Sequence, residues 1–173
     1  MKLVSKNLLF VITIILSLSL AGCGSSSKKT AAPSTDSSSE MTADEGTASN
    51  LEINGDSDSG KAGALKTVFF DFNSSTLSGS AKADLDSNVQ FLQENSAVTV
   101  QVEGHCDERG GVQYNIALGE KRAESTKAYL VSAGIDSSRV STISYGKERP
   151  ITFGHDDGAW GQNRRSNFVV LSK

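Results

Sequence analysis

The chain has 173 residues, which is enough for one domain of ordinary size and a short additional segment. It carries 17 lysines and arginines against 20 aspartates and glutamates, so its formal net charge is −3 at pH 7. A protein that binds nucleic acids needs a basic surface to neutralise phosphates, and this charge balance argues against such a partner.

The first 22 residues have the features of a signal peptide. Two lysines precede a mainly apolar run of 13 residues, from Leu8 to Leu20, which is shorter than the roughly 20 residues that a membrane-spanning helix needs. The sequence Leu20-Ala-Gly-Cys23 then matches the recognition site of the lipoprotein signal peptidase, with small residues before a thiol that can receive diacylglycerol. We therefore expect residues 1–22 to be a signal peptide and Cys23 to carry S-diacylglycerol and N-palmitoyl groups. The alternative is an ordinary secretory signal followed by an unrelated cysteine.

Lipidation of Cys23 would place the chain on a membrane. Each buried methylene contributes about 0.8 kcal/mol, and stable anchoring takes at least two acyl chains, which a triacylated cysteine exceeds. Gly24 stands where Asp would favour inner-membrane retention in enteric bacteria, so we expect the chain on the periplasmic face of the outer membrane. Cys106 is the only other cysteine, so no intramolecular disulfide is expected and the core must hold the fold.

Residues 24–63 have the composition of a tether. These 40 residues include 14 Ser or Thr and no aromatic residue, so they bury too little apolar surface to offset the entropy lost on ordering. A flexible coil of this length spans about 35 Å on average. We predict that residues 23–64 comprise the acylated cysteine and a disordered tether, and that residues 65–173 form the folded domain.

The first half of this domain alternates strand and helix signals. Thr67–Phe72 is predicted to be a strand because it is rich in β-branched and aromatic residues. Ser78 or Ser80 can cap a helix that runs to Asn95, since apolar residues recur on one of its faces at helical spacing. Three valines that alternate with other residues predict a second strand over residues 97–103.

The second half begins with a glycine-containing turn over residues 104–111. A helix is predicted over residues 115–133, and it ends at Gly134, a residue suited to the left-handed conformation that follows many helices. Strands are predicted over residues 140–145 and 167–171, with an irregular stretch between them that holds the only Trp. This order predicts an α+β fold, a two-layer sandwich with the helices on one face of a mixed four-stranded sheet.

Six motifs follow one another through the domain: Phe69-Phe-Asp-Phe72, Gly104-His-Cys-Asp-Glu-Arg-Gly110, Tyr114-Asn-Ile-Ala-Leu-Gly-Glu-Lys-Arg-Ala123, Ser144-Tyr-Gly-Lys-Glu-Arg-Pro150, Gly154-His-Asp156 and Gln162-Asn-Arg-Arg165. This series resembles the OmpA-like peptidoglycan-binding domain family, and within it the peptidoglycan-associated lipoproteins, over nearly all of residues 67–170. The resemblance implies a non-catalytic domain that binds the peptide stem of uncrosslinked peptidoglycan through diaminopimelate. It also implies a partner, the propeller protein TolB of the Tol system, and a role in holding the outer membrane to the cell wall during division.

The resemblance assigns the main ligand contacts to Asp107 and Arg122, which match the family's Asp and Arg by motif position. Diaminopimelate ends in an ammonium and a carboxylate on one carbon. Asp107 is expected to accept hydrogen bonds from the ammonium, and Arg122 to hold the carboxylate through its two-donor fork. Leu118 lies one helical turn from Arg122 and shares its face. The alternative is that Asp107 and Arg122 form an internal ion pair without a ligand.

Five more positions are expected to contact the ligand: Phe72, Asn73, Asn115, Leu118 and Arg164. Phe72 and Asn73 lie where the family's contacts begin, although Asn73 replaces a frequent Asp. Asn115 is predicted mainly as a helix cap, with ligand contact as an alternative or an addition, and unpaired backbone N–H groups near it are expected to supply further donors. Of two adjacent arginines, we favour Arg164 for the pocket and Arg165 for support of the loop.

The sequence holds no convincing catalytic or metal site. Adjacent residues in an extended chain point to opposite sides, which argues against a dyad of His105 and Cys106, and Cys106 is expected to be a small buried filler. A metal site that adds Asp107 and His155 to this pair has no recognised ligand spacing, so no cofactor is expected, and His155 is predicted to hold the loop before the Trp. Two other functions stay open: a lipid-anchored peptidoglycan hydrolase or amidase, and a structural lipoprotein with protein partners only.

Overall fold

The computed structural model describes residues 51–173, which form a four-stranded sheet with helices against it. The elements in chain order are β1 (Val68–Phe69), α1 (Gly79–Glu94), β2 (Thr99–His105), α2 (Val112–Ser132), the 3-10 turn η1 (Ser137–Arg139), β3 (Val140–Gly146), α3 (Asp157–Asn163) and β4 (Arg165–Ser172). The predicted signal peptide, the lipidation site at Cys23 and most of the predicted tether lie outside the described residues.

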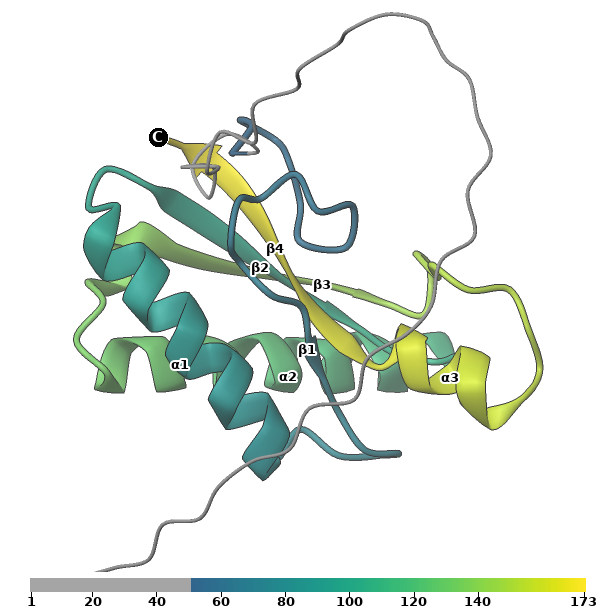
Figure 1. Ribbon diagram of the computed structural model, residues 1–173. Coiled ribbons are helices and arrows are strands. Elements are labelled where there is room, and N and C mark those ends of the chain that lie inside the picture. Colours follow the sequence, from purple (N-terminus) through teal and green to yellow (C-terminus); the bar gives the residue numbers. More distant parts are fainter. Residues whose placement is uncertain (1–50) are drawn as a thin grey trace, which may run out of the picture. The chain divides into compact units, whose positions relative to one another are not determined.

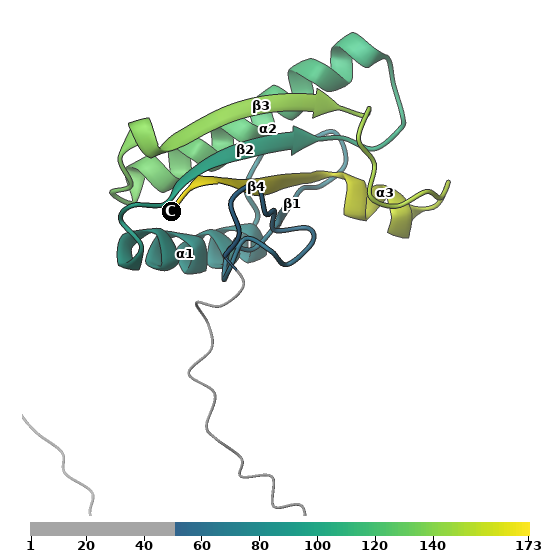
Figure 2. The same cartoon turned by 90° about the horizontal axis from the view of Figure 1, so that it is seen from above.

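The sheet has the strand order β1-β4-β2-β3, which Figure 2 shows from above. Strand β2 pairs in parallel with β3 and antiparallel with β4, and β4 pairs antiparallel with β1. The parallel pair is joined through α2, since two parallel strands need a crossover between them. The sheet is therefore mixed, as the sequence predicted.

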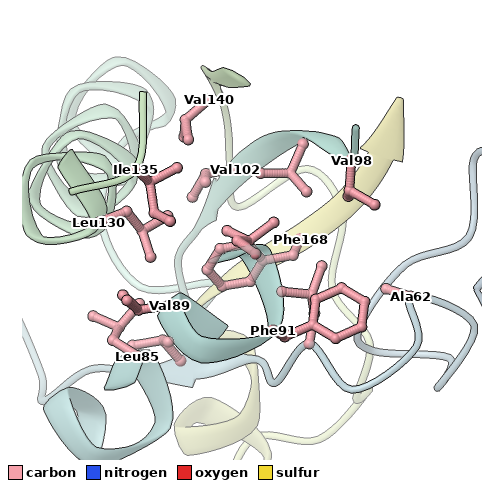
Figure 3. Close-up of a cluster of buried hydrophobic side chains, with 14 of the residues drawn as sticks. Ala62, Leu85, Val89, Phe91, Val98, Val102, Leu130, Ile135, Val140 and Phe168 are labelled. Carbon is pink, nitrogen blue, oxygen red and sulfur yellow. The ribbon is translucent and has the colours of Figure 1, made fainter. Parts of the chain in front are cut away.

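The two long helices, α1 and α2, pack on the same face of this sheet (Figure 1). Figure 3 shows the core between the layers, where side chains from both helices gather with strand residues around Phe168. The fully buried members include Leu85, Leu92, Val100, Val102, Leu130 and Phe168. Burial of each large apolar side chain contributes about 1.5–3 kcal/mol, so this layer is the main source of stability. The predicted α+β two-layer fold is confirmed.

The helix boundaries confirm some of the local signals and correct others. Ser78 caps α1 by accepting a hydrogen bond from the backbone N–H of Ala81 at 3.2 Å, and Gly134 follows α2 with φ of 97°. The prediction that Asn115 caps α2 is wrong, because the helix begins at Val112 and its N-cap is Gly111. The chain enters the helix directly from the tight turn, without a side-chain cap.

The predicted strand over residues 67–72 and the predicted irregular stretch after β3 also need correction. Only Val68–Phe69 forms β1, and the chain then turns away through Asn73, which has a positive φ of 53°. The irregular stretch contains α3, whose cap is Asp156: its carboxylate accepts from the N–H of Ala159 at 2.8 Å. Within residues 51–173, no helix combines the length and the apolar composition needed to cross a bilayer.

Residues 51–64, which we call the edge segment, pack on the domain instead of belonging to a disordered tether. Backbone N–H groups of Asn54 and Ser57 donate to carbonyls of β4 at 2.8 and 2.9 Å, and Ala62 is fully buried. Figure 1 shows this segment beside β4. The prediction of disorder was wrong here because it counted apolar side chains, whereas the open edge of a strand offers backbone hydrogen bonds. The ordered domain therefore includes residues before Leu65, where the sequence placed its start.

Candidate functional site

A cavity of about 230 Å³ lies at the end of the sheet where β2 leads into α2. The loop after β1, the turn between β2 and α2, the first half of α2 and the residue before β4 all contribute to its wall. Every residue that the sequence predicted as a ligand contact lines it: Phe72, Asn73, Asp107, Asn115, Leu118, Arg122 and Arg164. The fold thus brings together residues from three separate parts of the chain.

The carboxylate of Asp107 is almost completely buried and accepts four hydrogen bonds. Its Oδ1 accepts from the backbone N–H and the Nε of Arg109, at 3.1 and 3.2 Å. Its Oδ2 accepts from Nη2 of Arg109 at 2.7 Å and from Nη1 of Arg164 at 3.3 Å. Burial by itself raises the pKa of Asp107, but these hydrogen bonds outweigh burial and hold the pKa below its ordinary value. Asp107 is therefore ionised at neutral pH.

Arg109 is the residue that the sequence reasoning missed. Its guanidinium lies between two aromatic rings, with the central carbon 4.0 Å from the ring centroid of Phe72 and 4.0 Å from that of Trp160. A planar cation stacks well in this way while its edge binds a carboxylate. Two signals pointed to it: the Asp-x-Arg spacing inside a tight turn, and the only Trp of the chain in the last third of the domain.

Arg122 is fully buried and bonds to backbone carbonyls. Its Nε donates to the carbonyl of Ser74 at 2.8 Å, its Nη1 to that of His105 at 2.7 Å and its Nη2 to that of Asp71 at 3.1 Å. Burial lowers the pKa of Arg122, but a guanidinium stays protonated in proteins. The alternative of an internal Asp107–Arg122 ion pair is not what the structure shows, because the ionic partners of Asp107 are Arg109 and Arg164.

The cavity is electrostatically positive. Three of its lining residues carry guanidinium groups, Arg109, Arg122 and Arg164, and one carries a carboxylate, so the lining has a formal charge of +2. Positive charge in a concave, poorly solvated site favours anionic groups such as carboxylates. Arg164 is held in place because its Nε also donates to the carbonyl of Phe70 at 3.0 Å, whereas Arg165 bonds to Asp58 at 2.7 Å, outside the cavity.

Asn115 holds the turn that carries Asp107. Its Nδ2 donates to the carbonyls of Arg109 and Gly111, at 2.9 and 3.2 Å. Its own backbone N–H is already bonded to the carbonyl of Gly111 at 3.1 Å, so the expected free N–H groups near Asn115 are not found at this position. Tyr114, another residue that the sequence did not select, donates from its hydroxyl to the side chain of Asn73. This contact ties α2 to the loop after β1.

His105 and Cys106 point to different sides of the chain, as predicted. His105 stacks on Tyr145 with ring centroids 5.7 Å apart, outside the cavity. Cys106 faces the cavity, and burial raises the pKa of its thiol, so it is not an activated nucleophile. Among residues 51–173, no group of three or more His, Cys, Asp or Glu side chains is placed to hold a metal ion.

His155 anchors the loop between β3 and α3. Its Nδ1 lies 2.6 Å from Oε1 of Glu108, and Nε1 of Trp160 donates to the same oxygen at 2.9 Å. These bonds connect the loop and α3 to the turn that carries Asp107. The contact between His155 and Glu108 depends on pH, because this hydrogen bond raises the pKa of His155 and lowers the pKa of Glu108.

Comparison with known proteins gives consistent results. The sequence model of the OmpA family matches residues 69–164. The peptidoglycan-associated lipoprotein of Mesorhizobium japonicum is 38% identical over 157 residues, which cover 90% of this chain and 88% of that protein. The peptidoglycan-associated lipoprotein of Rhizobium meliloti is 45% identical over 103 residues, covering 60% of this chain and 58% of that protein.

Solved structures show the same fold. The crystal structure of the peptidoglycan-associated lipoprotein from Burkholderia pseudomallei aligns with a TM-score of 0.58 at 38% identity, covering 60% of this chain and 88% of that one. The periplasmic domain of MotB from Helicobacter pylori aligns with a TM-score of 0.54 at 19% identity, over 61% of this chain and 71% of that one. The MotB likeness concerns the fold alone.

Proposed function

Because this chain belongs to the OmpA family and, within it, to the peptidoglycan-associated lipoproteins, we propose that it binds peptidoglycan without cleaving it and tethers the outer membrane to the cell wall. The observation that carries the proposal is the cavity at the end of β2. It collects an ionised Asp107 and three guanidinium groups from residues that match the family's motif positions.

The proposed ligand is the diaminopimelate residue of an uncrosslinked peptide stem. Its free end presents an ammonium and a carboxylate on one carbon, and the rest of the stem adds further carboxylates. The lining charge of +2 suits a ligand with net negative charge, and Asp107 is the only acidic side chain of the lining that can receive the ammonium. Arg122 and Arg164 are held by carbonyls at fixed positions, where they attract the carboxylate.

Attachment to the membrane is proposed to come from lipidation of Cys23. The chain would then lie on the periplasmic face of the outer membrane, and the residues between Cys23 and the edge segment would connect the lipid anchor to the wall-binding domain. TolB and other Tol proteins are the proposed protein partners, in envelope integrity and cell division. If the cell wall and a protein partner bind the same face of the domain, the wall-bound state and the partner-bound state exclude each other.

The named relatives are wall-associated lipoproteins and not hydrolases, which favours binding without catalysis. The enzyme alternative predicts a cleared band when the purified protein is run in a gel that contains peptidoglycan. The alternative of a lipoprotein with protein partners only predicts that the protein does not bind purified wall.

Co-sedimentation with purified, diaminopimelate-containing sacculi tests the proposal. The wild type should sediment with the sacculi and be released by free diaminopimelate. Asp107→Asn should bind at least about tenfold more weakly, which corresponds to about 1.4 kcal/mol. The matched control is Asp136→Asn, an exposed position at the other end of the sheet, where either side chain can cap η1. Equal sedimentation of wild type and Asp107→Asn, with both folded by circular dichroism, would overturn the assignment.

A further inference from the structure

We propose that Arg109 is an internal competitor of the ligand: its guanidinium occupies the place at Asp107 that a ligand ammonium must take. This inference rests on the proposed function, since it concerns the same cavity. Ligand binding would then be an exchange, in which the ammonium replaces the guanidinium and Arg109 swings toward solvent. Arg109 would thereby lower the affinity of the site for ligands with an ammonium relative to ligands without one.

The first argument is the saturation of Asp107. An ionised carboxylate offers about four lone-pair positions for hydrogen bonds. Asp107 accepts four hydrogen bonds within the protein, three from Arg109 and one from Arg164. A ligand ammonium therefore finds no acceptor position at this carboxylate unless one of the two guanidinium groups leaves.

The second argument identifies which group leaves. The Arg164 side chain is 16% exposed and is also bonded to the carbonyl of Phe70. The Arg109 side chain is 32% exposed, and within the described residues its guanidinium donates hydrogen bonds to Asp107 only. Arg109 therefore has one hydrogen-bonding partner to give up, besides its stacking on Phe72 and Trp160, whereas displacement of Arg164 would also break its hydrogen bond to the carbonyl of Phe70.

The third argument is that the backbone can stay fixed during this movement. Asn115 binds the carbonyl of Arg109, and Lys147 donates to the carbonyls of Glu108 and Gly110 at 3.1 and 2.8 Å. The turn is thus held from α2 and from the loop after β3. Only the side chain of Arg109 has to rotate, which is a small and reversible change.

The aromatic pair around Arg109 explains why its guanidinium binds Asp107 when no ligand is present, an arrangement that we call the closed site. Phe72 and Trp160 hold the two faces of the guanidinium and leave its edge directed at Asp107. Phe72 is 60% exposed, so the core does not require it at this position. The two rings order a long side chain that would otherwise be mobile. They thereby favour the Arg109–Asp107 pair when no ligand is present.

Arg109 should affect the binding of ligand ends with an ammonium differently from that of ligand ends without one. A ligand end with a carboxylate and no ammonium has no reason to displace Arg109 and can bind the closed site. A zwitterionic end must displace it, so its apparent affinity is reduced by the fraction of molecules in which Asp107 is free. Removal of Arg109 should therefore strengthen binding of zwitterionic ends. It should weaken binding of ends that lack the ammonium, because Asp107, left with Arg164 as its only cationic partner within the described residues, repels their carboxylate more strongly.

The test uses the full-length chain and two synthetic stem tripeptides. One ends in meso-diaminopimelate, and its twin ends in 2-aminopimelate, so that the distal end keeps the carboxylate and lacks the ammonium. Binding is followed by isothermal titration and by the fluorescence of Trp160, the only Trp in the chain. The variants are Arg109→Gln and, as a control for the loss of one positive charge, Arg149→Gln, an exposed residue that stacks on Tyr145 outside the cavity.

The diaminopimelate peptide should change the fluorescence of Trp160 in the wild type, because it removes Arg109 from the indole ring. Arg109→Gln should bind this peptide about 5- to 30-fold more tightly than the wild type, with no gain for the twin, while Arg149→Gln should behave as the wild type. Weaker binding of the diaminopimelate peptide by Arg109→Gln, or an unchanged Trp160 signal at saturation, would overturn the inference. Failure of the wild type and of Arg149→Gln to bind either peptide or sacculi would instead overturn the proposed function, and this inference with it.

Discussion

The two ends of the sheet each contain an arginine that binds backbone carbonyls, and one of the two, Arg122, lines the cavity described above. At the pocket end, Arg122 binds three carbonyls from two segments beside the cavity: those of Asp71 and Ser74 in the loop after β1, and that of His105 at the end of β2. At the far end, about 20 Å away along β2, Arg139 donates from Nε to the carbonyl of Val98 at 2.9 Å and from Nη2 to those of Leu92 and Asn95 at 2.9 and 2.8 Å.

The comparison shows that burial and hydrogen bonding do not by themselves make an arginine a binding residue. Arg139 joins the end of α1 to the start of β2 and has a structural role. Arg122 likewise joins the loop after β1 to the end of β2, and its charge also lies in the cavity wall. The functional difference therefore lies in what surrounds the guanidinium: at the pocket end, Asp107 and two further arginines converge on the same space.

The sharpest test of this comparison is the matched pair Arg122→Met and Arg139→Met. Loss of Arg122 leaves several carbonyls without their donor, and we expect about 4 kcal/mol of lost stability, since each unsatisfied buried acceptor costs about 1–3 kcal/mol. For Arg139→Met we expect about 2 kcal/mol, because its surroundings are more open to water. Urea unfolding measures both.

Sacculus co-sedimentation under conditions where both variants are folded separates the two roles. Arg122→Met should lose binding and Arg139→Met should keep it. Retained binding by Arg122→Met would show that both arginines are purely structural and would remove the distinction between the two ends.

Glycines offer a second contrast between the ends. A Cβ added at Gly104 would lie 1.9 Å from the carbonyl oxygen of Gly119, so β2 and α2 would have to separate beside the pocket. We expect Gly104→Ala to lose about 3 kcal/mol. Gly134 at the far end has open space around its Cβ position and is needed only for its positive φ, so Gly134→Ala should lose about 1 kcal/mol. Thermal unfolding compares them, and equal losses would contradict the close approach at Gly104.

The smallest effect concerns pH and should be confined to the pocket end. The raised pKa of His155 means that its tie to Glu108 is fully present below the ordinary value of 6.5 and is lost as pH rises through the raised pKa. The lowered pKa of Glu108 means that the tie is also lost as pH falls below its ordinary value of 4.5. At the far end, the lowered pKa of Asp136 affects its cap only as pH falls below the ordinary value of 3.8.

Amide hydrogen exchange, corrected for the intrinsic pH dependence, measures this difference. Between about pH 6 and pH 8.5, the loop that contains His155 should lose protection, while the residues around Asp136 should not change. The matched variant His155→Gln should remove the pH dependence of the loop. Loss of protection at both ends in parallel would mean that a global change, and not this pair, is responsible.

Much of the fold was predictable because the signals are local. The apolar spacing of α1, its cap at Ser78 and the stop at Gly134 depend on residues within a few positions of each other. The edge segment was not predictable in this way, since its order comes from backbone bonds to β4, more than a hundred residues later in the chain. The start of α2 was also misplaced, because Gly111 gives no side-chain signal for a cap.

The candidate site was predictable as a set of residues but not as an arrangement. Asp107, Arg122 and Arg164 were found through motifs, and all of them line one cavity. The protein partner of Asp107 was not predicted: the only internal ion pair considered, the alternative with Arg122, is replaced in the structure by a pair with Arg109, a residue in the same turn. The slot that holds Arg109 joins Phe72 and Trp160, which are far apart in sequence and share no local pattern.

The sequence alone determined the two long helices and the four strands, which face of each is apolar, and which charged residues belong to the shared motifs, since all of these follow from local spacing; it did not predict α3. Only the tertiary structure decided where each guanidinium finds its acceptors. Arg122 is satisfied by carbonyls of Asp71, Ser74 and His105, and Asp107 is saturated by Arg109 and Arg164. The physical reason is that a long cationic side chain has several possible partners within reach, and the packing of distant segments selects among them.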